Sequence, residues 1–183
     1  MQTDELQIIR QILDGHPEEY RHLMRLHGRD LTVFIRGMTA TQEDAEEVVQ
    51  NAFVLAYKAL SQYDSSVASF ATWLHRIAYN EALKYARKRK IPTVSMDEDE
   101  GLIQTVSDST VDEWMLGATE ERLQMLDNAV EELPIQDKTL LQLYYEDGMP
   151  LAEAAYILGS EANNLAVRLH RIRKRLYLKL KDK

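Results

Sequence analysis

Side chains suited to reading DNA lie close together near the C-terminus of the chain. Amide and guanidinium groups follow Gly159 in a helical pattern. Amides can pair with base edges, and Arg and Lys can hold phosphates. The candidate contact residues are Asn163, Asn164, Arg168, Arg171, Arg173 and Lys174. This set favours DNA binding by the last helix, and the alternative is a helical hairpin with a solvated basic face.

A second candidate stretch, residues 60–90, interleaves aromatic residues with bases. Its aromatic and amide residues include Tyr63, Phe70, Trp73 and Asn80. Aromatic rings stack on unpaired bases, and cations follow a phosphate backbone. The same spacing is typical of a helix that buries its aromatic residues, so Phe70 and Trp73 fit either interpretation.

The elements that must position these residues are helices. Apolar residues recur every three or four positions, and the chain has only seven Gly and four Pro, so the pattern predicts an all-α fold. In the first half we expect helices between Thr3 and Gly15 and over about 17–37, 42–61 and 68–90. In the second half we expect them over about 119–132, 135–147, 150–158 and 161–180, the last two forming a helix-turn-helix around Gly159.

Acidic residues concentrate between the two halves. Residues 93–118 carry seven acids and no base, residues 1–92 carry 12 of each, and residues 119–183 carry 11 acids and ten bases. The acidic run at 97–100 and the flanking Pro92 and Gly101 are typical of a linker. We therefore expect two small helical domains, residues 1–92 and 119–183, joined by an acidic linker over 93–118.

Several classes of protein are disfavoured by what the sequence lacks. Without cysteine, disulfides and thiolate metal sites are excluded. Glu19 and His22 supply one half of a di-iron carboxylate pattern, but the second Glu-x-x-His is missing. No motif for phosphate binding or nucleophilic catalysis occurs. We therefore expect that the protein is not an enzyme and binds no cofactor or metal. The lack of a signal peptide or of a long apolar run predicts a cytoplasmic location.

Three segments, and the order in which they follow one another along the chain, resemble the extracytoplasmic-function (ECF) sigma factors of bacterial RNA polymerase. DAEEVVQNAF at residues 44–53 resembles the family's polymerase-binding helix, and FATWLHRIAYN at residues 70–80 resembles its promoter-melting helix. Residues 132–176 resemble its minus-thirty-five-binding domain. The resemblance covers both expected domains.

This resemblance implies a chain that binds core RNA polymerase, directs it to promoter DNA and helps to open the duplex. It implies polymerase contacts at Asp44, Glu47, Val48 and Gln50. It also places a loop that catches a flipped base at residues 61–69. The residues expected to contact and melt the minus-ten element are Tyr63, Ser69, Phe70, Trp73, Arg76, Asn80, Lys84 and Arg87. The basic last helix would bind the minus-thirty-five element.

Family members are commonly held by an anti-sigma protein, often one attached to the membrane. The resemblance therefore implies such a partner, and it implies no membrane insertion of this chain.

The alternative function is a stand-alone helix-turn-helix regulator, which would explain residues 119–183 equally well but would leave residues 60–90 without a role. The net charge of −8 favours a sigma factor, because the chain's own field would oppose DNA binding in the absence of polymerase.

Overall fold

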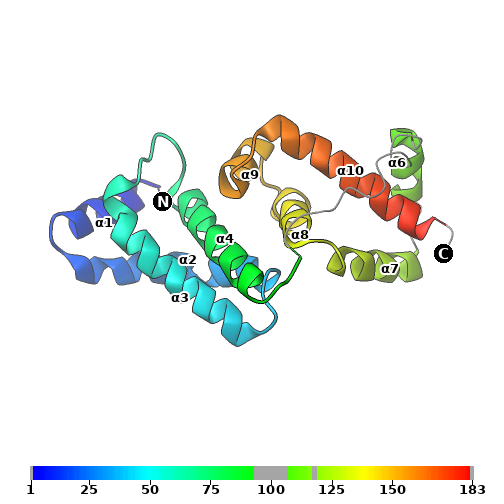
Figure 1. Ribbon diagram of the computed structural model, residues 1–183. Helices are drawn as coiled ribbons and strands as arrows, with labels where there is room; N and C mark the ends of the chain where they lie inside the picture. The colour runs from blue at the N-terminus through cyan, green and yellow to red at the C-terminus, as the bar shows by residue number, and fades with distance from the viewer. Residues whose placement is uncertain (1, 93–106, 117–118, 182–183) are drawn as a thin grey trace. The chain divides into compact units, whose positions relative to one another are not determined.

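The protein is helical throughout the part that the structure describes, which comprises residues 2–92, 107–116 and 119–181 of this computed structural model. Within those ranges every regular element is a helix (Figure 1), so the all-α prediction is confirmed. The acidic run at residues 97–100, and with it most of the predicted linker, lies outside the described residues.

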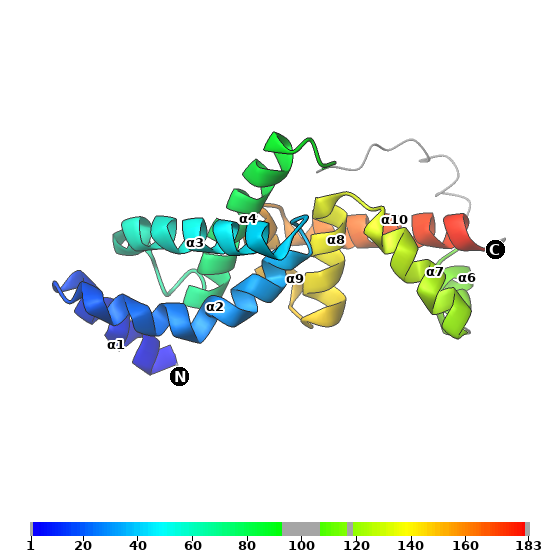
Figure 2. The ribbon, with the colours of Figure 1, turned by 90° about the horizontal axis from the view of Figure 1, so that it is seen from below.

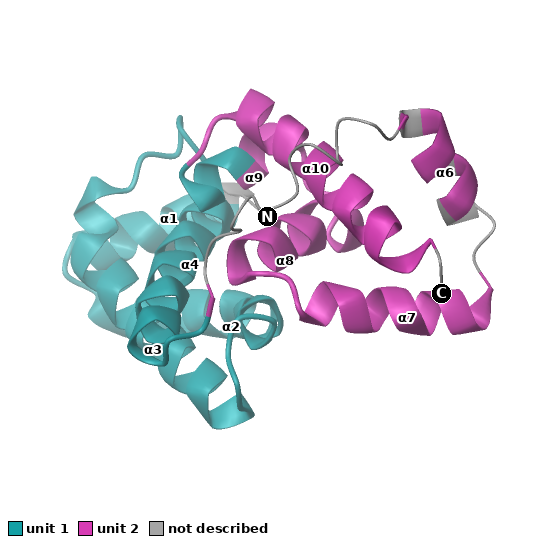
Figure 3. Ribbon diagram, turned by 45° about the vertical axis from the view of Figure 1, so that its right-hand side comes forward, with its two compact units in different colours: residues 1–91, 155–159 teal, residues 92–154, 160–183 magenta. Residues whose placement is uncertain are grey.

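Contacts divide the chain into two compact units (Figure 3). Unit 1 comprises residues 1–91 and 155–159, and unit 2 comprises residues 92–154 and 160–183. Unit 1 contains all of the residues predicted to contact polymerase and a melted strand, whereas unit 2 contains the basic last helix.

Unit 1 is a bundle in which α2, α3 and α4 pack against one another and α1 packs against α2 (Figure 2). Short 3₁₀ turns, η1 and η2, come directly before α2 and directly after α3. The bounds are α1 Gln2–Leu13, η1 Pro17–Glu19, α2 Tyr20–Arg36, α3 Gln42–Ala59, η2 Leu60–Gln62 and α4 Phe70–Lys88. Its most deeply buried large side chains are Leu23, Leu31, Ile35, Leu60, Phe70 and Leu74.

Hydroxyl side chains fix where α3 and α4 begin. Thr41 Oγ1 accepts the Asp44 backbone N–H at 3.1 Å and donates to the Asp44 carboxylate at 2.8 Å, so Thr41 caps α3. Ser69 Oγ accepts the Thr72 backbone N–H at 3.1 Å. Such caps contribute about 1 kcal/mol each. The second cap also anchors the end of the loop at residues 61–69.

Unit 2 is built around α10, which α6, α7 and α8 all contact. A single π-type turn, η3, continues α8. The bounds are α6 Asp108–Leu116, α7 Glu120–Glu131, α8 Ile135–Leu141, η3 Gln142–Glu146 and α10 Ala162–Leu180. Before α10 comes α9, Leu151–Leu158, of which residues 155–158 belong to unit 1. Gly159 takes a φ of +65° between α9 and α10, a conformation that favours glycine. An apolar stripe of α10 is buried at Leu165, Leu169, Ile172 and Leu176.

The last part of the predicted linker forms a helix, α6. Val111 and Trp114 lie one turn apart and therefore share a face of α6. Val111 is buried, and the Trp114 ring meets the Tyr177 ring of α10 edge to face at 5.9 Å. Burial of this apolar face explains why an acidic, Ser-rich segment becomes helical here.

Candidate nucleic-acid interface

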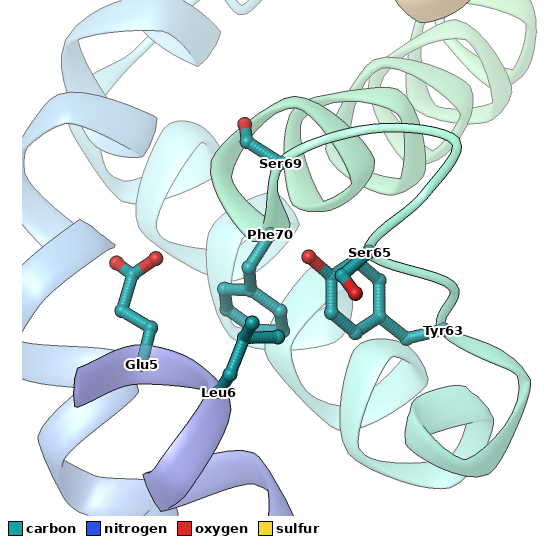
Figure 4. Close-up of a pocket in the computed structure, with 6 residues that line it drawn as sticks. All are labelled: Glu5, Leu6, Tyr63, Ser65, Ser69 and Phe70. Carbon is teal, nitrogen blue, oxygen red and sulfur yellow. The ribbon is translucent and has the colours of Figure 1, made fainter. Parts of the chain in front are cut away.

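A pocket of ≈ 110 Å³ lies where α1 meets the loop between η2 and α4 (Figure 4). This volume is several times what one water molecule needs. Two of its residues come from α1 and the others from the loop and the start of α4. The lining residues are Glu5, Leu6, Tyr63, Ser65, Ser69 and Phe70.

The loop at residues 61–69 is held in shape by its own hydrogen bonds. Asp64 Oδ1 accepts the Ser66 backbone N–H at 2.8 Å and the Ser66 hydroxyl at 2.7 Å. These two bonds lower the pKa of Asp64, because they stabilise its charged form. The Tyr63 hydroxyl donates to the Ala68 carbonyl at 3.1 Å. The wall of the pocket is therefore preorganised.

Three aromatic rings meet beside the pocket. The Tyr63 ring lies edge-on to Phe70 at 5.6 Å and 5.3 Å from Trp73, and Phe70 and Trp73 are 5.7 Å apart. Phe70 is only 1% exposed, whereas Tyr63 and Trp73 are partly exposed. Phe70 is thus a core residue, whereas Tyr63 and Trp73 each keep some exposed surface.

The negative charge at the pocket comes from Glu5. Its Oε1 lies 2.9 Å from His27 Nε2, and its side chain is 12% exposed. The His27 ring lies 5.3 Å from the Phe70 ring. Burial raises the pKa of Tyr63, and the charge of Glu5 raises it further. The Glu5 carboxylate and the Tyr63 hydroxyl therefore influence each other electrostatically within this pocket.

One face of α4 continues from the pocket. Trp73, Arg76 and Asn80 follow one another at helical spacing, with Arg76 partly exposed and Asn80 fully exposed. Lys84 and Arg87 are exposed further along, and Lys84 Nζ lies 2.5 Å from Glu81 Oε1. Except for the buried Phe70, the residues predicted to contact the melted strand therefore lie on one accessible surface.

The residues predicted to contact polymerase divide into two kinds on α3. Glu47 and Gln50 are exposed, whereas Val48 is buried in the core. Asp44 is held by the Thr41 cap and by Arg89 Nη2 at 3.2 Å. Hydrogen bonds from Tyr85 and then Thr41 lower the pKa of Asp44, and the Arg89 charge lowers it further. Of these four residues, only Glu47 and Gln50 are exposed and take no part in the cap or the core.

The predicted DNA-contacting residues of α10 also differ in their surroundings. Asn163 and Asn164 are exposed in its first turn. By contrast, Arg168 Nε donates to Asp137 Oδ1 at 2.6 Å, and its Nη1 donates to Gln136 Oε1 at 2.9 Å. Asp137 has 0% exposure, and sequence reasoning did not single it out. The charge of Arg168 is therefore used to bind α8.

Further along α10, α6 covers part of the basic surface. Lys174 is buried, and Arg171 and Arg173 are partly exposed. Val111 of α6 lines a small cavity together with His170, Arg173 and Lys174. The structure therefore makes the first turn of α10 the most accessible of the predicted DNA-contacting positions.

Comparisons with known proteins match a family model to each of the two parts of the chain described above. Family models of Sigma-70 region 2 and Sigma-70 region 4 match residues 23–91 and 123–176. The ECF RNA polymerase sigma factor SigF of Caulobacter vibrioides is 31% identical over 165 residues, covering 90% of this chain and 87% of that protein. The chain belongs to the ECF RNA polymerase sigma factors. The SigW protein of Bacillus subtilis is 28% identical over 185 residues, 95% of both chains.

A solved structure shows that the fold is shared as well. The sigma factor RpoE of Bartonella quintana, solved with the anti-sigma factor NepR, aligns with a TM-score of 0.60 at 21% identity. The alignment covers 90% of this chain and 98% of that one. ECF sigma factors are transcription initiation factors, not classical enzymes.

The region 2 match contains the loop, α4 and the exposed face of α3 in this sigma factor, and the region 4 match contains α9 and most of α10. Glu5 and Leu6 precede both matched ranges, although they line the pocket. Sequence reasoning missed them because only tertiary packing brings α1 to a loop more than fifty positions away.

Metal-binding side chains do not gather in the described ranges, where no group of at least three His, Cys, Asp or Glu residues could hold an ion. Glu19 Oε2 and His22 Nε2 lie 3.3 Å apart on neighbouring turns. None of the described helices combines the length and apolar character needed to cross a membrane.

Proposed function

We propose that residues 1–92 bind core RNA polymerase and the minus-ten element, that residues 119–183 bind the minus-thirty-five element, and that residues 93–118 join these domains. Together they direct polymerase to promoters and open the DNA there. Membership of the ECF sigma factors supports this assignment, and the preorganised pocket beside α4 is the observation that carries its mechanistic part.

For polymerase binding, we propose that Glu47 and Gln50 make the contact. Both are exposed on consecutive turns of α3 and so present one polar surface. Asp44 and Val48 support that surface from beneath, Asp44 through the helix cap and Val48 through the core.

For opening, we propose that the pocket receives a base flipped out of the non-template strand. The strand then continues over Trp73, Arg76 and Asn80. Flipping a base costs a few kcal/mol, and stacking on an aromatic ring returns about 1–3 kcal/mol per base. Because these terms are of similar size, stacking in the pocket can offset the cost of flipping one base.

At the minus-thirty-five element, we propose that Asn163 and Asn164 read base edges while Arg171 and Arg173 contact phosphates. Asn pairs well with adenine in the major groove. Arg168 and Lys174 contribute by positioning α10, since the first is paired with Asp137 and the second is buried.

We also propose an anti-sigma protein as a partner and the cytoplasm as the site of action. The complex of RpoE with NepR in Bartonella quintana supports such a partner for a chain of this fold. The membership in a family of RNA polymerase subunits supports a cytoplasmic location.

The test is transcription with purified core polymerase on promoters from the same genome, followed by scanning of the minus-ten non-template strand. We expect promoter-specific transcripts only when the chain is added. Removing each base in turn should show one position at which loss of the base weakens binding most, and 2-aminopurine there should brighten on opening. Equal transcription without the chain, or tight binding to duplex promoter without polymerase, would contradict the proposal.

A further inference from the structure

The chemistry of the pocket is set by one charged group. Of the residues that line it, only Glu5 carries a charge, and the others are apolar or hydroxyl-bearing. In Figure 4 the Glu5 side chain rises from α1 towards the chain around Ser69 and Phe70. A ligand in this pocket therefore meets a carboxylate as its strongest hydrogen-bond acceptor.

Two of the three hydroxyl groups that line the pocket, those of Tyr63 and Ser69, are already engaged. The Tyr63 hydroxyl donates to the Ala68 carbonyl, and Ser69 Oγ accepts the Thr72 N–H while lying 2.7 Å from Thr72 Oγ1. These bonds hold the loop and the start of α4, so they are not given up without loss of the pocket's shape. Glu5 is thus the side chain best placed to distinguish one ligand from another.

Glu5 also has a close polar neighbour. Its Oε1 lies 2.9 Å from Nε2 of the buried His27. A carboxylate offers about four acceptor positions, so this one close approach leaves acceptor capacity for a ligand. Burying a carboxylate is costly unless it is paired. A ligand that donates a hydrogen bond to Glu5 would therefore be favoured in this pocket.

The four bases differ in what they offer to a carboxylate. Cytosine, adenine and guanine carry exocyclic amines, which are hydrogen-bond donors, whereas thymine presents carbonyl oxygens on either side of its single ring N–H. Those oxygens would face the negative charge of Glu5. Enzymes and proteins that flip bases commonly read them by hydrogen bonds to the Watson–Crick edge.

We propose that Glu5 is a specificity-determining residue that selects an amino-bearing base over thymine at the flipped position of the minus-ten element. The inference rests on the proposed function of the pocket. It adds a residue of α1, outside the matched Sigma-70 region 2, to the promoter-reading surface.

The experiment uses the full chain assembled with core polymerase and single-stranded minus-ten oligonucleotides. The flipped position is first located by removing each base in turn. Oligonucleotides with each of the four bases there are then compared by competition. We expect wild-type holoenzyme to bind thymine on the order of tenfold more weakly than the preferred amino-bearing base, as for a hydrogen bond to a charged group. Glu5→Gln should narrow this gap to about threefold or less.

Asp4→Asn is the matched control, because it removes one negative charge from an exposed position on the same helix. General repulsion of DNA would make both variants bind all four bases more tightly by the same factor, whereas base selection should change only in Glu5→Gln. If Glu5→Gln does not fold, wild-type holoenzyme still tests the idea. Replacing the preferred base by its analogue without the amine should then weaken binding about tenfold.

The outcomes separate the two claims. If no single position loses affinity on base removal, the pocket does not hold a base and the proposed function of the pocket fails. If one such position exists but thymine binds as well as the other bases, or if Glu5→Gln leaves the preference intact, the role of Glu5 is overturned while the pocket stands.

Discussion

Arg168 Nε lies 2.6 Å from Oδ1 of Asp137, a carboxylate without exposed surface. Arg175 Nη1 approaches the other oxygen of Asp137 at 3.6 Å. Asp137 belongs to α8, and both arginines belong to α10. Because a buried charge is costly without its partner, this cluster fixes how α10 lies against α8, and with it the orientation of Asn163 and Asn164.

Replacing Asp137 by Ala should therefore destabilise the second unit. It leaves two arginines without a buried carboxylate, and breaking a buried ion pair costs about 3–5 kcal/mol. Urea unfolding monitored by circular dichroism measures the loss. Glu132→Ala, which removes the exposed partner of Lys179, is the control and should cost no more than about 1 kcal/mol. Equal unfolding midpoints for Asp137→Ala and wild type would show that the cluster does not hold α10.

Arg171 and Arg168 should differ when each is replaced by Ala in holoenzyme. Arg171→Ala should reduce the slope of promoter affinity against salt by about one unit. Its effect on unfolding should stay within about 0.5 kcal/mol. Arg168→Ala should instead lower the unfolding midpoint along with promoter affinity. Filter binding at several salt concentrations, paired with thermal unfolding, separates the two roles, and an unchanged slope for Arg171→Ala would remove it from the DNA interface.

The sequence was sufficient to predict the described helices other than α6, because apolar spacing, caps and glycines act locally. The Thr41 cap and the turn at Gly159 are examples of such local signals. The predicted site residues that are exposed, such as Gln50, Asn80 and Asn163, also follow from their places opposite the apolar stripes.

The sequence was insufficient where a polar side chain has a distant partner. Arg168 and Asp137 are 31 positions apart, and Arg89 meets Asp44 across 45 positions. Nothing local distinguishes such residues from solvated ones. Asp137 lies in the first turn of α8, where acids are common on exposed surfaces, so its position did not mark it as buried.

The double variant Glu47→Ala with Gln50→Ala should weaken binding to core polymerase and leave the fold unchanged. Both side chains are exposed, and surface substitutions usually change the free energy of unfolding by less than about 0.5 kcal/mol. Co-purification with core polymerase, alongside thermal unfolding, measures the two effects. Glu18→Ala, exposed on η1, serves as the control. Polymerase binding as strong as that of wild type would exclude this surface of α3.

Asp44 should contribute to stability in a pH-dependent way. Its pKa in the folded chain lies below the usual 3.8 because Tyr85, Thr41 and Arg89 favour the charged form. A lowered folded pKa stabilises the fold above the unfolded value, and this contribution is lost as the pH falls through the folded value. The urea midpoint of Asp44→Asn should therefore lie below that of wild type at pH 7, and the gap should close as the pH falls below 3.8. Glu43→Gln, in the same first turn, controls for the loss of one charge. A gap that stays constant with pH would contradict this origin of the stability.

Asn80 should serve opening and not folding. It is exposed on α4, one turn beyond Arg76 and two beyond Trp73, so it shares their face. Its amide both donates and accepts, which suits a base that has lost its Watson–Crick partner. Asn80→Ala should therefore unfold as wild type does, whereas Phe70→Ala, at a core position, should lose about 3–5 kcal/mol.

The decisive measurement for Asn80 follows 2-aminopurine placed in the minus-ten element of a duplex promoter. Holoenzyme with Asn80→Ala should still form the closed complex, yet the fluorescence rise should be slower or smaller than with wild type. A template already mismatched at the minus-ten element should relieve the defect, because the mismatch removes the pairing that Asn80 would otherwise help to replace. Gln11→Ala, an exposed amide on α1, should open duplex and mismatched templates as wild type does. A defect that persists on the mismatched template would instead assign Asn80 to an earlier step, and normal opening of the duplex would remove it from the strand-binding face.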